Sequence, residues 1–196
     1  MIFLKKWTIK SLTKKIKLLQ QQRVHSQPNN QMIAKEIDMY FSLADIYKKL
    51  AKNKKFPFAG IMVQECLRGA AELDNDKAQY QLALKLINEA KFRQKLENEE
   101  IFSNSSNQKK AHQLFEEGIA YLSSAEQLGN IQAKRFHGLC YINGWGVEMD
   151  RKKGFDLVVE SIDKEGNWEK VPQIFAEIGL NKPEFFSALV KHRGKS

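Results

Sequence analysis

Apolar residues recur every three or four positions along most of this chain, and that spacing predicts α-helices. Stripes of this kind occupy residues 33–47, 59–70, 78–90, 114–125, 133–141 and 155–162, with two shorter ones at 174–178 and 185–190. Only 4 prolines occur in 196 residues, whereas strands usually come with turn signals about every 8–12 residues. The pattern therefore predicts an all-α fold.

The longest of these helices is expected where turn residues are missing. No Gly or Pro occurs between Asp76 and Ile101, which predicts one helix of about 24 residues, while the mean α-helix has about 11–12. Its partner, from about residue 108 to 128, is also long. We expect an extended helical hairpin at about 77–128 with its tip at residues 103–107.

The first 24 residues predict a basic amphipathic helix, which a segment around Pro28 ends. The apolar stripe of this helix consists of Ile9, Leu12, Ile16 and Leu19. A row of lysines on another face consists of Lys6, Lys10, Lys14 and Lys17. A second, smaller apolar strip consists of Phe3, Trp7 and Leu18.

Three interpretations of this helix stay open. It lies on an anionic membrane surface, it docks on a partner protein through its apolar stripe, or it folds back over an exposed end of the domain with its lysines solvated. Nucleic acid is disfavoured as a partner because Trp7 is the only large aromatic residue among the lysines.

The charge distribution sets this helix apart from the rest of the chain. The net charge is +9, and residues 1–30 hold seven basic and no acidic residues. The remainder has 32 − 7 = 25 basic and 23 acidic residues and is nearly neutral. We therefore divide the chain into a basic segment with its linker, 1–30, and a helical domain, 31–196.

Localisation signals are few. No apolar run approaches the roughly 18 residues that a membrane span needs, and the N-terminus lacks the apolar core and cleavage site of a signal peptide. Two cysteines without a disulfide framework suggest a reducing compartment. We expect a cytoplasmic protein.

An internal repeat appears at three helix junctions, where the next helix restarts at Ala78, Ala133 and Val171. Around the second junction the residues follow a longer pattern, made by Ala125, Glu126, Gly129, Asn130, Ala133, Gly138, Tyr141, Gly144, Gly146, Val147, Asp150 and Lys153. This pattern resembles that of Sel1-like repeats, relatives of the tetratricopeptide repeats, and the resemblance covers roughly residues 57–180.

The resemblance implies a short right-handed α-solenoid of three to four antiparallel helix pairs. The chain departs from the family pattern at two places: His137 takes a leucine slot and Gly154 an alanine slot. The glycine-valine turn of the pattern also occurs only once.

That turn, YINGWGVEMD, resembles a phosphate-binding loop at first sight. A dinucleotide loop would need a third small residue where Met149 stands, and no Lys-Ser or Lys-Thr follows the glycines. We interpret the stretch as a structural turn instead. Gly144 ends a helix with positive φ, Gly146 bends the chain again, Val147 turns inward, and Asp150 caps the next helix.

Other candidate chemistry is sparse. His137 and Cys140 are only two ligands, whereas structural zinc requires four, and the dense carboxylates suggest solvated helix faces. We expect no metal, no cofactor and no catalytic residue. Trp145 and Trp168 are candidate surface contacts because tryptophan is enriched at binding hot spots; packing between repeats is the alternative.

The family resemblance implies a non-enzymatic adaptor or scaffold. By that analogy we expect a subunit of a bacterial multiprotein assembly, such as membrane-associated secretion machinery, in the cytoplasm at the inner face of the bacterial membrane. Two alternatives stay open: a peripheral membrane protein anchored by residues 1–24, and a secreted effector that binds a host protein. The sequence does not identify the protein partner.

Overall fold

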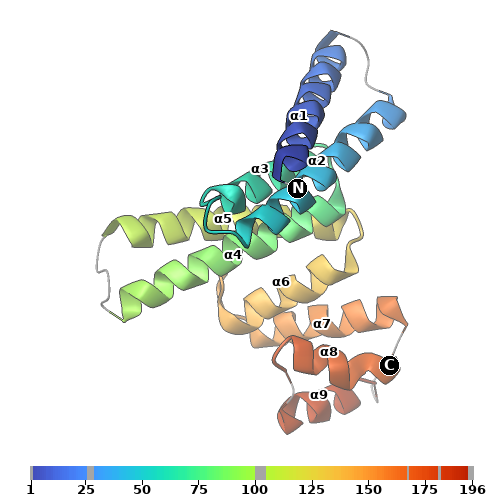
Figure 1. Cartoon of the computed structure of the whole chain (residues 1–196). Helices are drawn as coiled ribbons and strands as arrows, with labels where there is room; N and C mark the ends of the chain where they lie inside the picture. Colours follow the sequence, from blue (N-terminus) through green and yellow to red (C-terminus); the bar gives the residue numbers. More distant parts are fainter. Residues whose placement is uncertain (1, 26–28, 100–104, 167, 181, 194–196) are drawn as a thin grey trace. The chain divides into compact units, whose positions relative to one another are not determined.

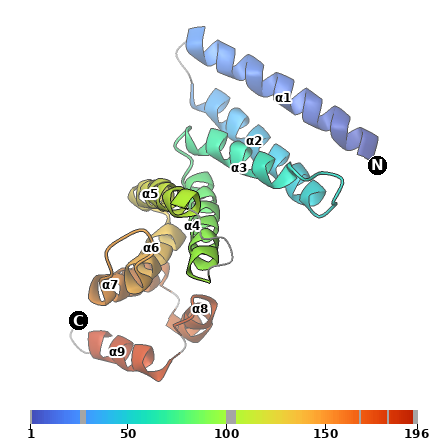
Figure 2. The ribbon, with the colours of Figure 1, turned by 90° about the vertical axis from the view of Figure 1, so that its left-hand side faces the viewer.

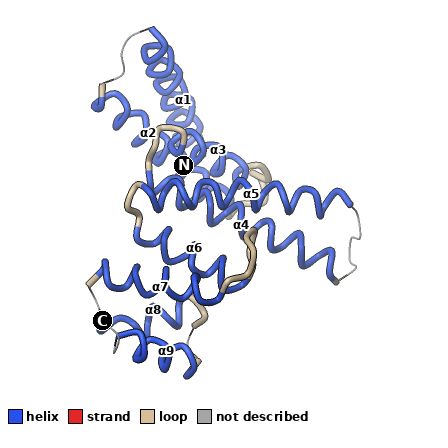
Figure 3. Tube along the Cα trace, turned by 180° about the vertical axis from the view of Figure 1, so that it is seen from behind, coloured by secondary structure: helices blue, strands red, loops and turns tan. Residues whose placement is uncertain are grey.

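The structure is a computed structural model that describes residues 2–25, 29–99, 105–166, 168–180 and 182–193. All regular structure in these residues is helical, which confirms the predicted all-α class (Figures 1 and 3). The α-helices are α1 (Ile2–His25), α2 (Asn30–Ala51), α3 (Ala59–Ala71), α4 (Asp76–Asn98), α5 (Ser105–Gln127), α6 (Ile131–Asn143), α7 (Arg151–Glu165), α8 (Val171–Glu177) and α9 (Pro183–Arg193), with a 3-10 turn, η1 (Trp168–Lys170), before α8.

The chain forms two compact units, and the division falls inside α4, between Lys85 and Leu86. The sequence suggested a boundary after residue 30 because the charge changes there. That division stays a prediction, and the first compact unit contains α1 together with α2 and α3.

In the first unit, α2 packs against both α1 and α3 (Figure 2). The core between α2 and α3 is apolar and includes Leu43, Ala44, Val63 and Leu67. Helix α1 lies along α2 with Ile16 buried, while Ile9, Leu12 and Leu19 are half-buried. The apolar stripe of α1 is therefore the face that contacts α2.

In the second unit, α6 packs against α5 and α7. A further apolar cluster joins α6 and α7 to the last two helices, and Phe175 of α8 is fully buried in it. Helices that follow one another in the sequence therefore pack against each other.

The long helices occur where turn residues are missing. Helices α4 and α5 have 23 residues each, close to the predicted length. The prediction for the tip was wrong in part, because residues 105–107 belong to the first turn of α5. The rest of the predicted tip lies outside the described residues.

At two of the three helix junctions named from the sequence, an Asn side chain caps the next helix in the same way. The Asn75 side chain accepts a hydrogen bond from the Ala78 amide at 2.9 Å, and the Asn130 side chain accepts one from Ala133 at 2.8 Å. In each case an Asn side chain satisfies an amide that the first helical turn leaves free. At these two junctions an Asn N-cap sets the start of the helix, two residues before the predicted restart positions. At the third junction, α8 begins at Val171 without a side-chain cap.

None of the helices in the described residues has the length and apolar run that crossing a membrane requires.

Candidate functional site

The glycine-containing turn after α6 determines the geometry of the candidate site. Gly144 is the C-cap residue, with φ 70° and ψ 31° in the left-handed region, which glycine adopts without strain. The amides of Gly144 and Trp145 both donate to the Cys140 carbonyl. The chain therefore reverses within two residues and the Trp145 backbone is fixed to the end of α6.

The second half of the turn fits closely against α5. Gly146 also has φ 70°, and a Cβ at this position would lie 2.9 Å from the Cβ of Phe115. Val147 is half-buried. The Asp150 side chain then caps α7 by accepting from the Lys153 amide at 2.9 Å. Gly144 and Asp150 thus occupy cap positions.

This turn places Trp145 between the core and α4. The indole is half-buried and packs on the apolar cluster of the second unit, with its ring centroid 6.3 Å from that of Phe136. On its other side the Lys91 ammonium lies 3.4 Å from the ring centroid. That geometry is a cation–π contact, which fixes the Lys91 side chain over the indole.

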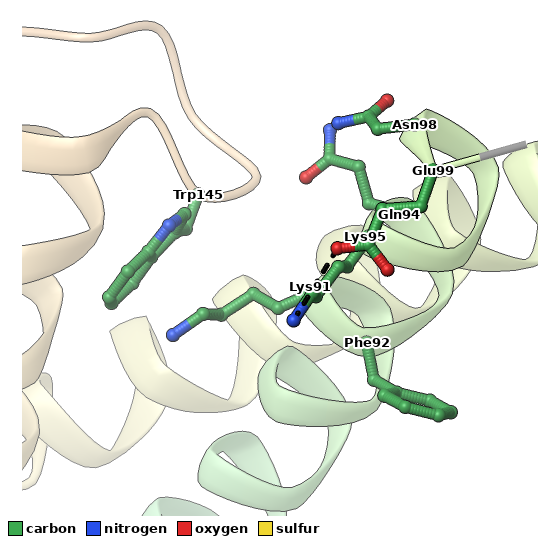
Figure 4. A pocket seen from close by; sticks show the side chains of 7 residues that line it. All are labelled: Lys91, Phe92, Gln94, Lys95, Asn98, Glu99 and Trp145. Atoms are coloured by element: carbon green, nitrogen blue, oxygen red, sulfur yellow. Dashed lines mark ion pairs between the residues drawn. The ribbon is translucent and has the colours of Figure 1, made fainter.

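A pocket of about 510 Å³ opens between Trp145 and the last turns of α4 (Figure 4). Such a volume falls within the roughly 300–1,000 Å³ of typical ligand pockets. Lys91 extends toward the indole, whereas the Phe92 ring points away from it. The lining side chains are Lys91, Phe92, Gln94, Lys95, Asn98, Glu99 and Trp145.

The pocket carries one positive charge that no carboxylate balances. Lys95 pairs with Glu99 at 3.5 Å, but within the described ranges no acidic side chain pairs with Lys91. Burial lowers the pKa of Lys91, and Cys140 acts in the opposite direction. The arrangement is chemically suited to an anionic group beside an apolar one.

Nucleophilic chemistry has little support at this place. Cys140 lies near Lys91, but it is fully buried and burial raises its pKa to about 12. A thiol in that state supplies almost no thiolate. Its sequence neighbour His137 has Nδ1 2.8 Å from Glu126 Oε2, so the two are not directed at one another as nucleophile and base.

No group of three or more metal-ligating side chains occurs in the part of the chain that the structure describes.

The candidate contact residues of α1 lie on two different faces. Ile9, Leu12, Ile16 and Leu19 face α2, as described above. The four lysines at positions 6, 10, 14 and 17 are exposed, and Trp7 is 68% exposed. The side chain of Phe3 lies outside the described residues.

Trp168 is half-buried in η1 and packs against the apolar cluster of the second unit. The two tryptophans named from the sequence therefore have different surroundings. Trp145 lines the pocket beside the last turns of α4.

Two contacts were not foreseen from the sequence. Lys91 was not singled out from the sequence, because nothing local in the sequence links it to Trp145. Glu36, which pairs with Arg23 at 3.5 Å and is 2% exposed, had a signal that was overlooked. It lies three residues after Ile33 and four before Tyr40, on the apolar stripe of its own helix.

No protein-family model, no curated protein and no solved structure matches the chain. The resemblance to Sel1-like repeats stays a prediction from the sequence.

Proposed function

We propose that this protein is a non-enzymatic adaptor whose pocket beside Trp145 holds an extended segment of a partner protein. The observation that carries the proposal is the Lys91 ammonium, which lies on the Trp145 ring without a carboxylate partner among the described residues. A carboxylate of the partner would supply that counter-charge. The indole would cover an apolar side chain next to it.

The other lining residues suit a peptide backbone. Gln94 and Asn98 are one turn apart on α4, and Figure 4 shows their side chains next to each other. Each primary amide offers both donors and an acceptor, which match the N–H and C=O groups of an extended chain. The proposed ligand is therefore a segment with an acidic residue beside an apolar one.

The wider setting of the proposal comes from the Sel1-like resemblance. On that basis we propose a right-handed solenoid of helix pairs that belongs to a bacterial multiprotein assembly such as secretion machinery. The proposed location is the cytoplasm, including the inner face of the membrane. The packing of adjacent helices in pairs is compatible with that architecture. A secreted effector with a host partner would use the same pocket chemistry.

The direct test is selection of peptides from a random displayed library by the full-length protein. We expect enrichment of Asp or Glu next to an apolar residue. Trp145→Ala and Lys91→Gln should each weaken a selected peptide by roughly ten-fold, which corresponds to about 1.4 kcal/mol. Lys91→Glu should shift the preference toward Lys and Arg.

Lys109→Gln is the matched control, because Lys109 is an exposed lysine of α5 that does not line the pocket. Circular dichroism checks that every variant stays folded. Peptides without acidic preference, or equal binding by Lys91→Gln and Lys109→Gln, would contradict the proposed pocket.

A further inference from the structure

Helix α1 is held to α2 by polar as well as apolar contacts. Arg23 pairs with the buried Glu36 at 3.5 Å, and Gln20 Nε2 donates to the Tyr40 hydroxyl at 2.8 Å. Together with the buried Ile16, these contacts occupy the inner face of the helix. The apolar stripe is therefore covered in this structure and does not present a free docking surface.

The opposite face of α1 is basic and exposed. Lys6, Lys10, Lys14 and Lys17 recur at intervals of three or four residues and are all exposed. At about 1.5 Å of rise per residue they span roughly 16 Å. No Asp or Glu occurs in residues 1–30, and no acidic side chain of the described residues pairs with any of the four.

Two large apolar side chains lie beside this lysine row. Trp7 is 68% exposed and Leu18 is 49% exposed. At about 100° per residue, both fall on the side of the helix that also carries Lys10 and Lys14. The outer face thus combines a row of positive charge with an indole that is largely in water.

We propose that this outer face binds the surface of an anionic lipid bilayer while α1 stays packed on α2. Clusters of about four to eight basic residues on an amphipathic helix are typical of binding to anionic lipids. Tryptophan favours the headgroup region because its ring is apolar and its N–H is polar. Here the lysines would contact lipid phosphates and Trp7 would enter the interface between them.

Two other anionic partners fit this face less well. Single-stranded nucleic acid is bound by several aromatic side chains on which successive bases stack, and here a single indole is exposed among the lysines. Protein interfaces are depleted of lysine relative to the remaining surface. A diffuse anionic surface makes no demand for a precise fit, and a flexible lysine row suits it.

This inference is independent of the Trp145 pocket, because it uses only residues of α1 and α2. It also differs from anchoring by a released helix. A released α1 would insert Ile9, Leu12, Ile16 and Leu19, whereas the proposed attachment leaves those side chains on α2. Attachment and the α1–α2 contacts are therefore expected to coexist.

The test is co-flotation of the full-length protein with vesicles at about 0.1 M salt, where exposed charges still interact over about 10 Å. One set contains phosphatidylglycerol in phosphatidylcholine, and the other phosphatidylcholine alone. We expect flotation with the anionic vesicles only. Combined Lys10→Gln, Lys14→Gln and Lys17→Gln substitutions should reduce it at least about ten-fold, since each lysine contributes to surface attraction.

The matched control removes the same charge elsewhere, through Lys109→Gln, Lys110→Gln and Lys152→Gln at exposed positions. It should float within about two-fold of wild type, because these three lysines belong to α5 and α7 and not to the proposed binding face of α1. If both triple variants lost flotation equally, binding would depend on the net charge of the protein and not on the α1 face. That result would overturn the proposal. Flotation with neutral vesicles would overturn it as well.

A second measurement reads the geometry of the attached state. When the protein is bound to anionic vesicles, the amides of α1 and of the facing part of α2 should exchange hydrogen as slowly as they do in solution. In the flotation experiment, Trp7→Ala should reduce binding. Loss of protection in α1 on binding would instead indicate helix release. Tighter binding of duplex DNA or RNA than of anionic vesicles at the same salt would reassign the face to nucleic acid.

Discussion

Gly138 in α6 and Gly154 in α7 approach each other so closely that a Cβ on either would lie 2.5 Å from the carbonyl oxygen of the other. Neither neighbour is a flexible side chain; both are helix backbone. The contact explains why glycine rather than alanine stands at position 154. At this crossing of the two helices even one methyl group has no room.

The first prediction follows from this contact. In Gly154→Ala the new methyl group would also lie 2.8 Å from the Ile142 backbone nitrogen, so α6 and α7 must separate. Overpacking of this kind costs about 1–3 kcal/mol, which exceeds the gain of up to about 1 kcal/mol from replacing a helical glycine. Urea unfolding should show a net loss of stability.

Gly60→Ala provides the control for that experiment. Gly60 lies in α3 with nothing within 4 Å of an added Cβ, so the helix propensity of alanine acts alone. We expect it to be neutral or to stabilise by up to about 1 kcal/mol. Equal effects of the two substitutions would show that α6 and α7 are not in close backbone contact.

The second prediction concerns His137, a buried polar residue of α6. Its Nδ1 binds Glu126, while its Nε2 is buried without a hydrogen-bond partner in the described part of the chain. An unsatisfied buried polar atom costs about 1–3 kcal/mol. His137→Leu removes that atom and leaves Glu126 beside Lys134 at 3.7 Å.

Thermal unfolding should therefore find His137→Leu within about 1 kcal/mol of wild type, because loss of the Glu126 contact and removal of the orphaned nitrogen oppose each other. His137→Ala leaves a cavity and should cost more, about 2–4 kcal/mol. If the leucine variant lost as much stability as the alanine variant, the hydrogen bond to Glu126 would stabilise the fold by more than the orphaned nitrogen destabilises it.

Local signals explain what the sequence could predict. The caps at Asn75, Asn130 and Asp150, and the left-handed residue Gly144, each depend on atoms within a few residues. Their short-range patterns are visible in the sequence. The lengths of α4 and α5 followed in the same way from the absence of Gly and Pro.

Contacts between distant parts of the chain were not predictable by this route. Lys91 contacts Trp145 because the turn after α6 packs on α5. The spacing of apolar residues along the chain does not predict this contact. The buried Glu36 likewise depends on how α1 lies on α2. For α1, sequence alone left three interpretations open, and the exposed fractions of its side chains distinguish the inner from the outer face.

The third prediction is a pH dependence at the α1–α2 contact. Burial raises the pKa of Glu36 above its ordinary value of 4.5, and Arg23 opposes this shift. A raised pKa means that the folded state holds the proton more tightly than the unfolded state. The contribution of Glu36 to stability is therefore most favourable below pH 4.5 and declines as the pH rises through the folded pKa.

Glu36→Gln should remove this dependence, since an amide does not ionise. We expect the stability of wild type relative to Glu36→Gln to fall as pH increases above 4.5, measured by urea unfolding at matched pH values. Glu65→Gln is the control, because Glu65 is exposed on α3. If the free energy of unfolding of wild type, relative to that of Glu36→Gln, rose with pH, the ion pair with Arg23 would affect the Glu36 pKa more strongly than burial does.

The fourth prediction uses one cysteine in each unit. Cys66 of α3 and Cys140 of α6 are both free and buried, and burial raises their pKa values to about 11 and about 12. Neither thiol should react with a thiolate-specific reagent in the folded protein at about pH 8, where an ordinary cysteine is partly ionised. Labelling of each thiol should require local or global opening.

Mass spectrometry of the two labelled sites under increasing urea then reports on each unit separately. If the division at residues 85 and 86 also marks a boundary of cooperativity, Cys66 and Cys140 should become reactive at different urea concentrations. Gly154→Ala should shift the Cys140 transition to lower urea and leave that of Cys66 in place. Parallel shifts at both thiols would show that the chain unfolds as one cooperative unit.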